Sequence, residues 1–342
     1  MTRICLSFIS TLAAVALTAA SANAALISGP RSIGSFYTSD DGASHAIIGK
    51  SSGDVVEAYW WEGTGTSASV IAHFDSIAAV SGFWANDSWR HAVVALHNGQ
   101  VWDVRYHPCC GIFPTMLVNL AGWGDIKSMT AWTDPQSHTN IAFLTHWGTG
   151  NAFGVFQTGG NTPTTTTFVN IYQNDSAIDV AGHHEIWNAT NMVSVAVGNP
   201  SHVEQIYWND NQGPGNFFDI SPGTNVPWAT RFSGAAVVSL SATDAFCYFC
   251  SQWAGVEQMD MVTRTNQMLT FDVNNGGGLL FADWTFTYGP AVQSITGPFT
   301  SPVSGGFRRN TLVAMTNGDI WDMNPLWTSG AVSWTFRFVG NF

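Results

Sequence analysis

The stretch His91-Ala-Val-Val-Ala-Leu-His-Asn-Gly99-Gln-Val-Trp-Asp103-Val-Arg-Tyr106 has two apolar runs on either side of an Asn-Gly pair. Asn-Gly favours a tight turn with positive φ, so the stretch predicts a β-hairpin. The same order of residues recurs in His45–Trp60 and in Asn310–Met323. In all three copies a glycine lies eight residues after the first polar residue, and an acid lies twelve residues after it. This repetition predicts a fold built from copies of one antiparallel unit.

Weaker copies fill the intervening sequence, in Asn140–Gly154, Asn191–Glu204 and Ala245–Glu257. Asn140–Gly154 has lost the acid, so we expect no ligand site there. An apolar segment opens each unit, and the interval between successive segments is roughly the length of one four-stranded propeller blade. We therefore predict an all-β fold, a six-bladed β-propeller of four-stranded antiparallel blades, with repeats that begin near residues 32, 76, 125, 177, 236 and 291.

The start of the chain has the features of an export signal. Arg3 precedes an apolar stretch that ends in the A-x-A sequence Ala22-Asn23-Ala24. We expect residues 1–24 to be a signal peptide, residues 25–342 to be a single propeller domain, and the mature protein to be secreted. The alternating segment Ala331–Phe338 should complete the last blade, and a segment near Leu26–Gly29 should pair with it to close the ring.

Composition narrows the classes of partner. Charged residues are 10% of the chain, whereas apolar residues are 45% and aromatic residues 13%, which is typical of a folded protein with an uncharged polar surface. The net charge is −12, with eleven lysines and arginines. Nucleic acids and anionic membranes are not expected as partners, because both need clustered cations. No segment beyond the signal is long and apolar enough for a membrane anchor, so we expect a soluble protein.

Four cysteines follow the expected signal, Cys109, Cys110, Cys247 and Cys250. An even number in an exported chain favours disulfides over a redox or zinc site. The two pairs lie in blades two and five, which are opposite each other in a six-membered ring and too far apart to be bridged. We therefore expect local disulfides, with a bridge between the adjacent Cys109 and Cys110 as the favoured one.

Each good copy of the unit places a polar residue near an acid. A hairpin symmetric about Ser51 makes His45 face Glu57, and the same arithmetic pairs His91 with Asp103 and Asn310 with Asp322. Directly opposite residues have Cβ atoms about 5 Å apart. Such a pair either ties the strands of a blade together or binds a ligand.

A ligand role would suit a sugar, because a carboxylate and a neighbouring donor hold adjacent hydroxyls while an aromatic ring covers the apolar face. Trp84, Trp89 and Trp102 are among the further aromatic residues beside the pairs. Our candidate ligand-binding residues are His45, Glu57, Tyr59, Trp60, His91, Asp103, Tyr106, Asn191, Glu204, Glu257, Asn310 and Asp322.

The spacing of a polar residue, a glycine and an acid followed by aromatics resembles the repeat of the fungal fucose-specific lectins. That resemblance implies a six-bladed propeller with sugar sites between adjacent blades. It also implies that an arginine at the first position works with the acid. The acids that match are Glu57, Asp103, Glu257 and Asp322, with Glu204 less well placed, whereas the arginine position holds His45, His91, Asn140, Asn191, Ala245 and Asn310.

Two other functions remain alternatives, a protein-interaction scaffold and a propeller enzyme such as a glycosidase. Ser39-Asp40-Asp41-Gly42 comes closest to a sialidase box, but it occurs once and lacks the tryptophan. Glycoside hydrolysis needs two carboxylates in one cleft, whereas the acids here are spread one to a blade. His183-His184-Glu185 is expected in a loop, and adjacent histidines point apart in an extended chain. We expect no catalytic residues, no cofactor and no metal, and we expect carbohydrate as the partner.

Overall fold

The computed structural model describes residues 25–28, 31–85, 88–122, 124–133, 139–147, 150–158, 166–173, 177–185, 190–198, 201–209, 216–219, 237–245, 256–274, 277–286, 289–303, 306–328 and 331–342, and for some strands the backbone only. These residues form six four-stranded sheets. They contain no helix of the length and apolar character that would cross a membrane. The expected signal peptide, Cys247 and Cys250 lie outside the described residues.

Each sheet consists of four consecutive strands, each antiparallel to the next, and we number these blades one to six in chain order. The innermost strands are β1 (Ile33–Tyr37), β5 (Ile77–Trp84), β9 (Ile126–Thr133), β13 (Ala177–Glu185), β17 (Val237–Ala245) and β21 (Val292–Val303). The second strands are β2 (Ser44–Gly49), β6 (Arg90–Leu96), β10 (Thr139–Trp147), β14 (Thr190–Gly198), β18 (Val256–Thr263) and β22 (Gly306–Met315). The third strands are β3 (Asp54–Trp60), β7 (Gln100–His107), β11 (Gly150–Thr158), β15 (Ser201–Asn209), β19 (Gln267–Asn274) and β23 (Asp319–Thr328). The outermost strands are β4 (Ser67–His73), β8 (Gly111–Asn119), β12 (Thr166–Gln173), β16 (Asn216–Asp219), β20 (Gly277–Thr285) and β24 (Ala331–Asn341).

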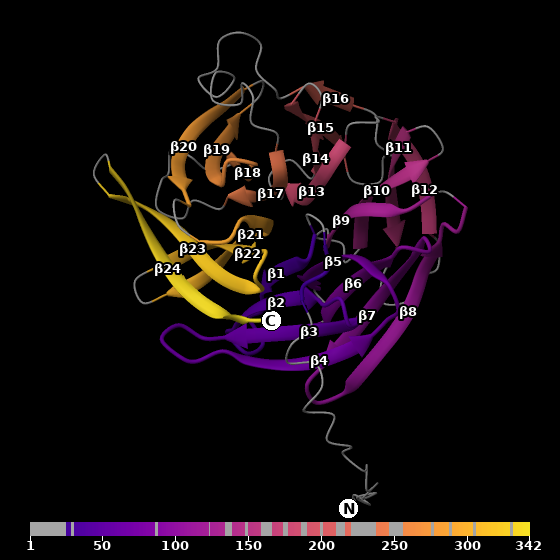
Figure 1. Ribbon diagram of the computed structural model, residues 1–342, viewed down its shortest axis with the longest axis horizontal. Helices are drawn as coiled ribbons and strands as arrows, with labels where there is room; N and C mark the ends of the chain where they lie inside the picture. The colour runs from indigo at the N-terminus through magenta and orange to yellow at the C-terminus, as the bar shows by residue number, and fades with distance from the viewer. Residues whose placement is uncertain are drawn as a thin grey trace, which may run out of the picture.

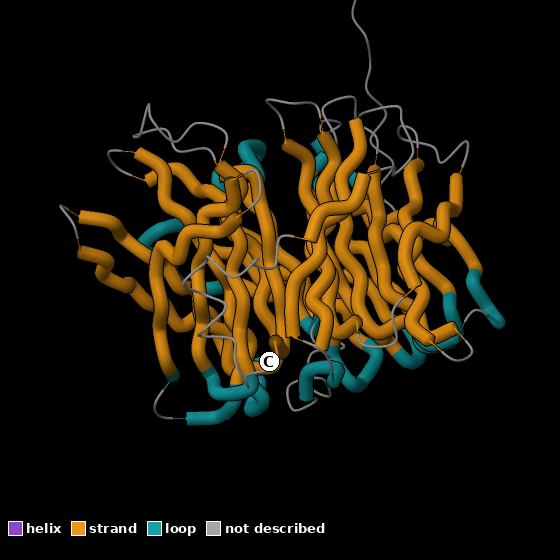
Figure 2. Tube along the Cα trace, turned by 90° about the horizontal axis from the view of Figure 1, so that it is seen from above, coloured by secondary structure: helices purple, strands orange, loops and turns teal. Residues whose placement is uncertain are grey.

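The innermost strands form a closed ring in the order β1, β5, β9, β13, β17 and β21, with β21 again beside β1. Figure 1 shows the six sheets arranged around a centre, with β4, β8 and β24 at the periphery. Figure 2 shows the same strands from the side, with loops at both ends. The predicted six-bladed β-propeller is confirmed.

The innermost strands begin close to where the sequence predicts. Predicted boundaries just before Ile77, Ile126, Val237 and Val292 coincide with the first residues of β5, β9, β17 and β21. The fourth blade begins at Ala177, one residue before the predicted Ile178. The apolar core lies between neighbouring blades, where Ile47 and Val55 of blade one pack with Val80 and Ala92 of blade two.

The repeated glycine ends the turn between the second and third strands of a blade. Gly53, Gly99 and Gly318 have φ of 92°, 85° and 89°, in the left-handed region that glycine tolerates. The amide of each glycine donates to the carbonyl three residues earlier, as in the 2.9 Å bond from Gly53 N to Lys50 O. A turn followed by one left-handed residue makes a three-residue loop centred on Ser52.

The turn geometry corrects the predicted pairing. His45 lies opposite Tyr59, and Glu57 lies opposite Ile47. In blade two His91 is likewise opposite Arg105 and not Asp103. The prediction was wrong because it centred the loop on Ser51, one residue too early. The polar residue and the acid are therefore diagonal neighbours on the same face of the sheet.

The ring does not close as predicted. The segment 25–27 pairs with the end of β2, where Ile27 N donates to Gly49 O at 3.0 Å and Ser51 N donates to Ala25 O at 2.7 Å. In blade two the carbonyl of Ser76, just before β5, makes the same kind of bond to His97 N. The segment thus supplies the beginning of an innermost strand that β1 lacks, and β24 pairs with β23 of its own blade. Side-chain packing closes the ring, since Leu26 and Ile33 lie in one core cluster with Leu312.

Short side chains allow the innermost strands to meet at the axis. A Cβ on Gly34 of β1 would lie 2.6 Å from the amide nitrogen of Gly82 on β5, so any larger residue there would push the first two blades apart. Five innermost strands carry a fully buried small or short residue two positions after their first residue, and Ser32 occupies the same place in blade one. The six residues are Ser32, Ala79, Ser128, Asp179, Ser239 and Ser294.

Asp179 is the one acid in this set, and it pairs with an arginine from the opposite side of the ring. Arg31, just before β1, donates through Nε to Asp179 Oδ1 at 3.0 Å and through its terminal nitrogen to the Val180 carbonyl. Ser128 of blade three and Ser239 of blade five also donate to the Asp179 carboxylate.

The remaining two blades are hydrogen-bonded to residues of the same group. Ile295 N of blade six donates to Ser239 Oγ at 3.1 Å, and Val80 N of blade two donates to the Arg31 carbonyl at 2.9 Å. One buried network thus contacts all six blades.

Replacing Asp179 with alanine should lower the free energy of unfolding by about 3–5 kcal/mol, because it leaves the buried Arg31 without its carboxylate. Urea unfolding followed by tryptophan fluorescence measures this loss. Asp125→Ala is the matched control, because Asp125 pairs with His97 in an exposed position and such a pair contributes about 0–1 kcal/mol. Equal losses in the two variants would show that the axial network does not hold the ring.

Candidate ligand site between blades one and two

Three blades contain the same three-residue arrangement across their first three strands. In blade one Phe36 lies opposite His45, with their rings stacked 5.0 Å apart, and His45 Nδ1 is 2.8 Å from Glu57 Oε1. In blade two the Phe83 and His91 rings stack at 4.7 Å. These phenylalanines were not among the residues predicted from the sequence.

The blade-two histidine makes the same kind of contact with its acid, since His91 Nδ1 lies 3.0 Å from both carboxylate oxygens of Asp103. Blade six has Phe299 opposite Asn310, and the Asp322 carboxylate accepts from Asn324 Nδ2 at 3.3 Å. The three pairs that the sequence singles out therefore occupy equivalent places in their blades.

The Glu57 carboxylate is buried beneath the contact between blades one and two. Arg90 of β6 donates to Glu57 Oε1 at 3.3 Å, and the Tyr106 hydroxyl donates to it at 2.9 Å. His45 is fully buried and Glu57 is 4% exposed. Arg90 directly precedes His91. The same position holds Ser44 in blade one and Thr139 in blade three, whereas blade six also has an arginine, Arg309, directly before Asn310. Arg90 was not among the residues predicted from the sequence, although it directly precedes His91 of the repeat.

Two aspartates of the β1–β2 loop share this arginine and reach the surface. Arg90 donates to Asp41 Oδ2 at 2.6 Å and to Asp40 Oδ2 at 3.4 Å. Asp41 also accepts from Thr38 Oγ1 at 2.6 Å and from the amide of Ala43 at 2.9 Å. The Asp41 side chain is one quarter exposed, so a fixed carboxylate faces solvent at the blade interface.

Burial and partners set the charge of this cluster. Burial alone would raise the pKa of Asp41, but hydrogen bonds from His45, Thr38 and the Ala43 amide lower it well below its usual range. Burial likewise opposes the charged form of His45, yet hydrogen bonds to Asp41 and Glu57 raise its pKa above the ordinary value. Burial and the nearby Glu57 charge raise the pKa of Tyr106, which keeps its hydroxyl protonated as a donor.

Aromatic side chains surround the two aspartates. Trp61 Nε1 donates to the Asp41 carbonyl at 2.8 Å, and the indole is 39% exposed. On the other side, His107 Nε2 lies 3.7 Å from Asp40 Oδ2 and its ring meets the half-buried Trp89 edge-on at 5.7 Å. These side chains form a partly exposed row, which we call the loop-end row, in the order Trp61, Asp41, Asp40, His107 and Trp89. Hydrogen bonds link the row at the Trp61 end, and ion-pair and ring contacts link it at the Trp89 end.

The other predicted residues of blades one and two lie deeper. Trp60 is 2% exposed and belongs to the core cluster between blades six and one, and Tyr106 is also buried. Tyr59 is half-buried and lies edge-on to Trp61, with ring centroids 5.6 Å apart. The Asp103 side chain keeps 16% of its surface exposed, so this acid is more open than Glu57.

Blade four does not repeat the polar pair. Asn191 lies opposite Trp208 and Glu204 lies opposite Val195, so the two are too far apart in register to be diagonal neighbours. Asn191 is buried and accepts from Trp132 Nε1 of blade three at 2.9 Å. The span from Asn191 to Trp208 is three residues longer than the span from His45 to Tyr59, whereas the acid comes only one residue later, so Glu204 falls short of the diagonal position.

The prediction for blade five is wrong, because it assigned the residues of the repeat to the wrong strands. Glu257 lies on the second strand, β18, opposite Asp244, and not on the third strand where Glu57 lies. The left-handed turn residue of this blade is Asn266, with φ of 58°, which replaces the glycine that the repeat led us to expect. Counting back eight residues from Asn266 places Gln258, and not Ala245, at the polar position. In blade three the position diagonal to Asn140 is Val155, which carries no acid.

The predicted loop at His183-His184-Glu185 is a strand. Both histidines lie on β13 and are buried. Burial, together with the neighbouring His184, lowers the pKa of His183 to about 3, so this imidazole is neutral.

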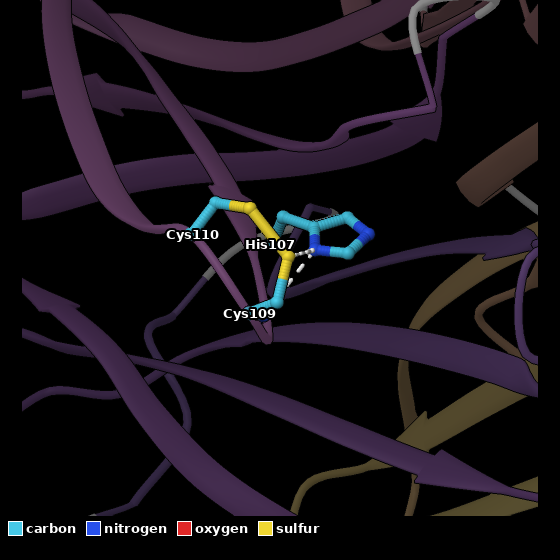
Figure 3. A group of neighbouring side chains, drawn as sticks. All are labelled: His107, Cys109 and Cys110. Atoms are coloured by element: carbon cyan, nitrogen blue, oxygen red, sulfur yellow. Dashed lines mark hydrogen bonds between the residues drawn. A yellow bond between two sulfur atoms is a disulfide. The ribbon is translucent and has the colours of Figure 1, made fainter. Parts of the chain in front are cut away.

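The predicted bridge between Cys109 and Cys110 is present as a vicinal disulfide in the turn between β7 and β8 (Figure 3). His107 lies beside it, with Nδ1 2.9 Å from Cys109 Sγ. The predicted local pairing of Cys247 and Cys250 lies outside the described residues.

The sequence matches no known protein-family model and no curated protein sequence. The structure is similar to that of AofleA from Arthrobotrys oligospora, with a TM-score of 0.61 and 9% identity over 93% of this chain and 88% of that chain. It is also similar to the Aleuria aurantia lectin, with a TM-score of 0.59 and 10% identity over 93% of this chain and 98% of that chain. For BP39L lectin from Burkholderia pseudomallei the TM-score is 0.59, with 11% identity over 92% of this chain and 85% of that chain. The resemblance inferred from the repeat thus extends to the whole fold.

Glu57→Gln should lower the free energy of unfolding by about 1–3 kcal/mol, because buried donors on His45, Arg90 and Tyr106 lose part of their acceptor. Asp103→Asn is the matched control, since it removes the same charge from a more exposed acid that pairs with His91, and it should cost less than Glu57→Gln. Chemical unfolding of the two variants measures both values. A larger loss in Asp103→Asn would refute the strut role of Glu57.

The raised pKa of His45 predicts a pH dependence. A group whose pKa is higher in the folded protein adds stability that is complete below its unfolded pKa, about 6.5, and is lost as the pH rises through the folded value. The difference in unfolding free energy between the wild type and His45→Gln should therefore shrink as the pH rises above about 6.5. Urea unfolding of both proteins at a series of pH values measures it, and a constant difference would contradict protonation of His45 in the folded state.

Proposed function

We propose that this protein is a carbohydrate-binding propeller of the lectin type, and that the loop-end row between blades one and two contacts the sugar. The observation that carries the proposal is the pair of partly exposed carboxylates, Asp40 and Asp41, held by Arg90 beside the exposed indole of Trp61. Carboxylates accept hydrogen bonds from adjacent sugar hydroxyls, and an indole covers the apolar face of the ring.

The buried residues beneath the row keep its carboxylates in place. Glu57, His45 and Tyr106 hold Arg90 and the β1–β2 loop, so Asp41 loses little conformational freedom when it accepts hydroxyl hydrogen bonds. In this proposal the repeated polar pair of blade one supports the site and the exposed loop residues contact the sugar. His91 and Asp103, which are less buried, remain candidates for direct contact.

The fold supports the choice of ligand class. The Aleuria aurantia lectin is described as a six-bladed propeller with a novel fucose recognition mode, and SapL1 lectin was solved with α-methyl fucoside. Arg90 also brings a guanidinium to the acid at the blade interface, from the position directly before the one where the resemblance implies an arginine. Fucosides are therefore the first sugars to test.

We also propose that the protein acts outside the cell, on the strength of the signal-like residues 1–24 and the disulfide between Cys109 and Cys110. Residues 25–342 would then be one propeller domain. Mass spectrometry of the exported protein tests the signal peptide, since an N-terminus other than Ala25 would contradict the expected cleavage.

An interaction scaffold is a second candidate, favoured by one observation. The outermost strand of blade two, β8, exposes Ile112, Phe113 and Met116, and the Phe113 side chain is 52% exposed. Exposed apolar residues on an edge strand are a typical docking surface for another protein.

Glycan-array screening of the protein followed by calorimetric titration with the best ligand tests the sugar hypothesis. Trp61→Ala should weaken binding roughly ten-fold or more, equivalent to about 1.4 kcal/mol, while leaving the melting temperature nearly unchanged. Trp284→Ala is the matched control, because Trp284 is exposed to a similar degree but lies on blade five, where its ring packs against Phe336 of blade six. Failure to bind any glycan, or equal effects of the two variants, would overturn the proposal and leave the scaffold as the better one.

A further inference from the structure

The turn between β7 and β8 gathers three side chains of the kinds that bind zinc. His107 and Gly111 form the last pair of the hairpin, and the amide of Cys110 donates to the His107 carbonyl at 3.1 Å. One ligand atom from each of His107, Cys109 and Cys110 lies within 4.8 Å of the other two. Figure 3 shows the imidazole directed at the disulfide, and both cysteines are exposed.

The two ring nitrogens of His107 face different groups. Its Nδ1 faces Cys109 Sγ at 2.9 Å and accepts from the Cys109 amide at 3.3 Å. Its other ring nitrogen, Nε2, lies 3.7 Å from the Asp40 carboxylate, and the edge of Trp89 contacts the ring. Metal-bound histidines commonly have a carboxylate on the far side of the ring, where Asp40 lies, and zinc at Nδ1 would replace the hydrogen bond from the Cys109 amide.

We propose that reduction of the Cys109–Cys110 disulfide turns this hairpin into a zinc site, with His107 Nδ1 and both cysteine sulfurs as ligands. A dithiol reductant supplies two electrons and two protons, so the sulfur–sulfur bond breaks, two thiols form, and the dithiol becomes a cyclic disulfide. Zinc then replaces the two thiol protons. The fourth position is open to water, as in sites with three protein ligands.

The distances suit zinc once the sulfurs separate. Zinc takes sulfur at about 2.3 Å and imidazole nitrogen at about 2.0–2.1 Å, so two thiolates on one tetrahedral ion lie roughly 3.8 Å apart. The three ligand atoms already lie within 4.8 Å, so only small rotations of the cysteine side chains are needed. Reduction opens no long loop, because the two cysteines are adjacent, and the turn stays held by the backbone of the hairpin.

Titration of the reduced protein with Co²⁺, a spectroscopic substitute for zinc, tests the site. The reduced wild type should bind one equivalent more than Cys109→Ser/Cys110→Ser reduced in the same way, with a correspondingly stronger sulfur-to-cobalt charge-transfer band. Comparing these two proteins cancels any binding by Cys5, Cys247 and Cys250. The oxidised wild type should not show the additional equivalent.

Single variants test the role of each neighbour. Asp40→Asn should weaken zinc binding on the order of 10- to 100-fold, which is typical of the residue that orients a histidine ligand. His107→Ala should abolish the additional equivalent. His97→Ala is the matched control, because His97 is also exposed and paired with an aspartate, but no described cysteine lies beside it, and it should change nothing.

A second measurement does not depend on the variants. Zinc should slow the alkylation of Cys109 and Cys110 by iodoacetamide in the reduced wild type, with each cysteine quantified by peptide mass spectrometry. Equal cobalt binding by the reduced wild type and Cys109→Ser/Cys110→Ser, or alkylation at the same rate with and without zinc, would overturn the proposal.

Discussion

The ion pair of Arg31 and Asp179 across the axis is the constraint on which the ring depends. A propeller with this topology has no strand shared between its first and last blades, so the ring must close by side-chain contacts. Removing two charges from water is costly, and the pair is stable only because hydroxyl and amide groups complete its hydrogen bonding. These groups come from Ser128, Ser239 and Val180, so the charges are satisfied only when the blades that carry them are in place. Because of this network, the free-energy cost of burying the two charges is lowest in the closed ring.

The same physical rule explains the candidate site. Glu57 is buried where blade two covers blade one, and Arg90 from the covering blade neutralises it. Because Arg90 also binds Asp40 and Asp41, the position of the surface carboxylates depends on contact between the two blades. A blade isolated from its neighbour would have the residues of the site without their geometry.

Much of the fold was predictable because a single residue, a glycine at a left-handed position, identifies each of several turns. Gly53, Gly99 and Gly318 mark left-handed positions that recur with the blade, and the acid four residues later completes a pattern that chance seldom repeats. The pattern failed where another residue took the glycine's place, as Asn266 does in blade five. The register of the hairpin was not predictable from spacing alone, because a loop centred on Ser51 and one centred on Ser52 fit the same sequence. The partners from other blades, Arg90 for Glu57 and Arg31 for Asp179, were not predictable either, since they lie 33 and 148 residues away along the chain.

Every sheet is built from one uninterrupted segment of chain, since β24 stays within blade six and the segment 25–27 stays within blade one. A cut in the connection between β8 and β9 would therefore divide no sheet. It would produce one fragment with Arg31 and another with Asp179. The two fragments would carry whole blades with complementary apolar faces, and the axial charges would become the recognition element between them. The protein is thus suited to fragment complementation, in which two separate polypeptides rebuild the ring and the buried ion pair selects the correct partner.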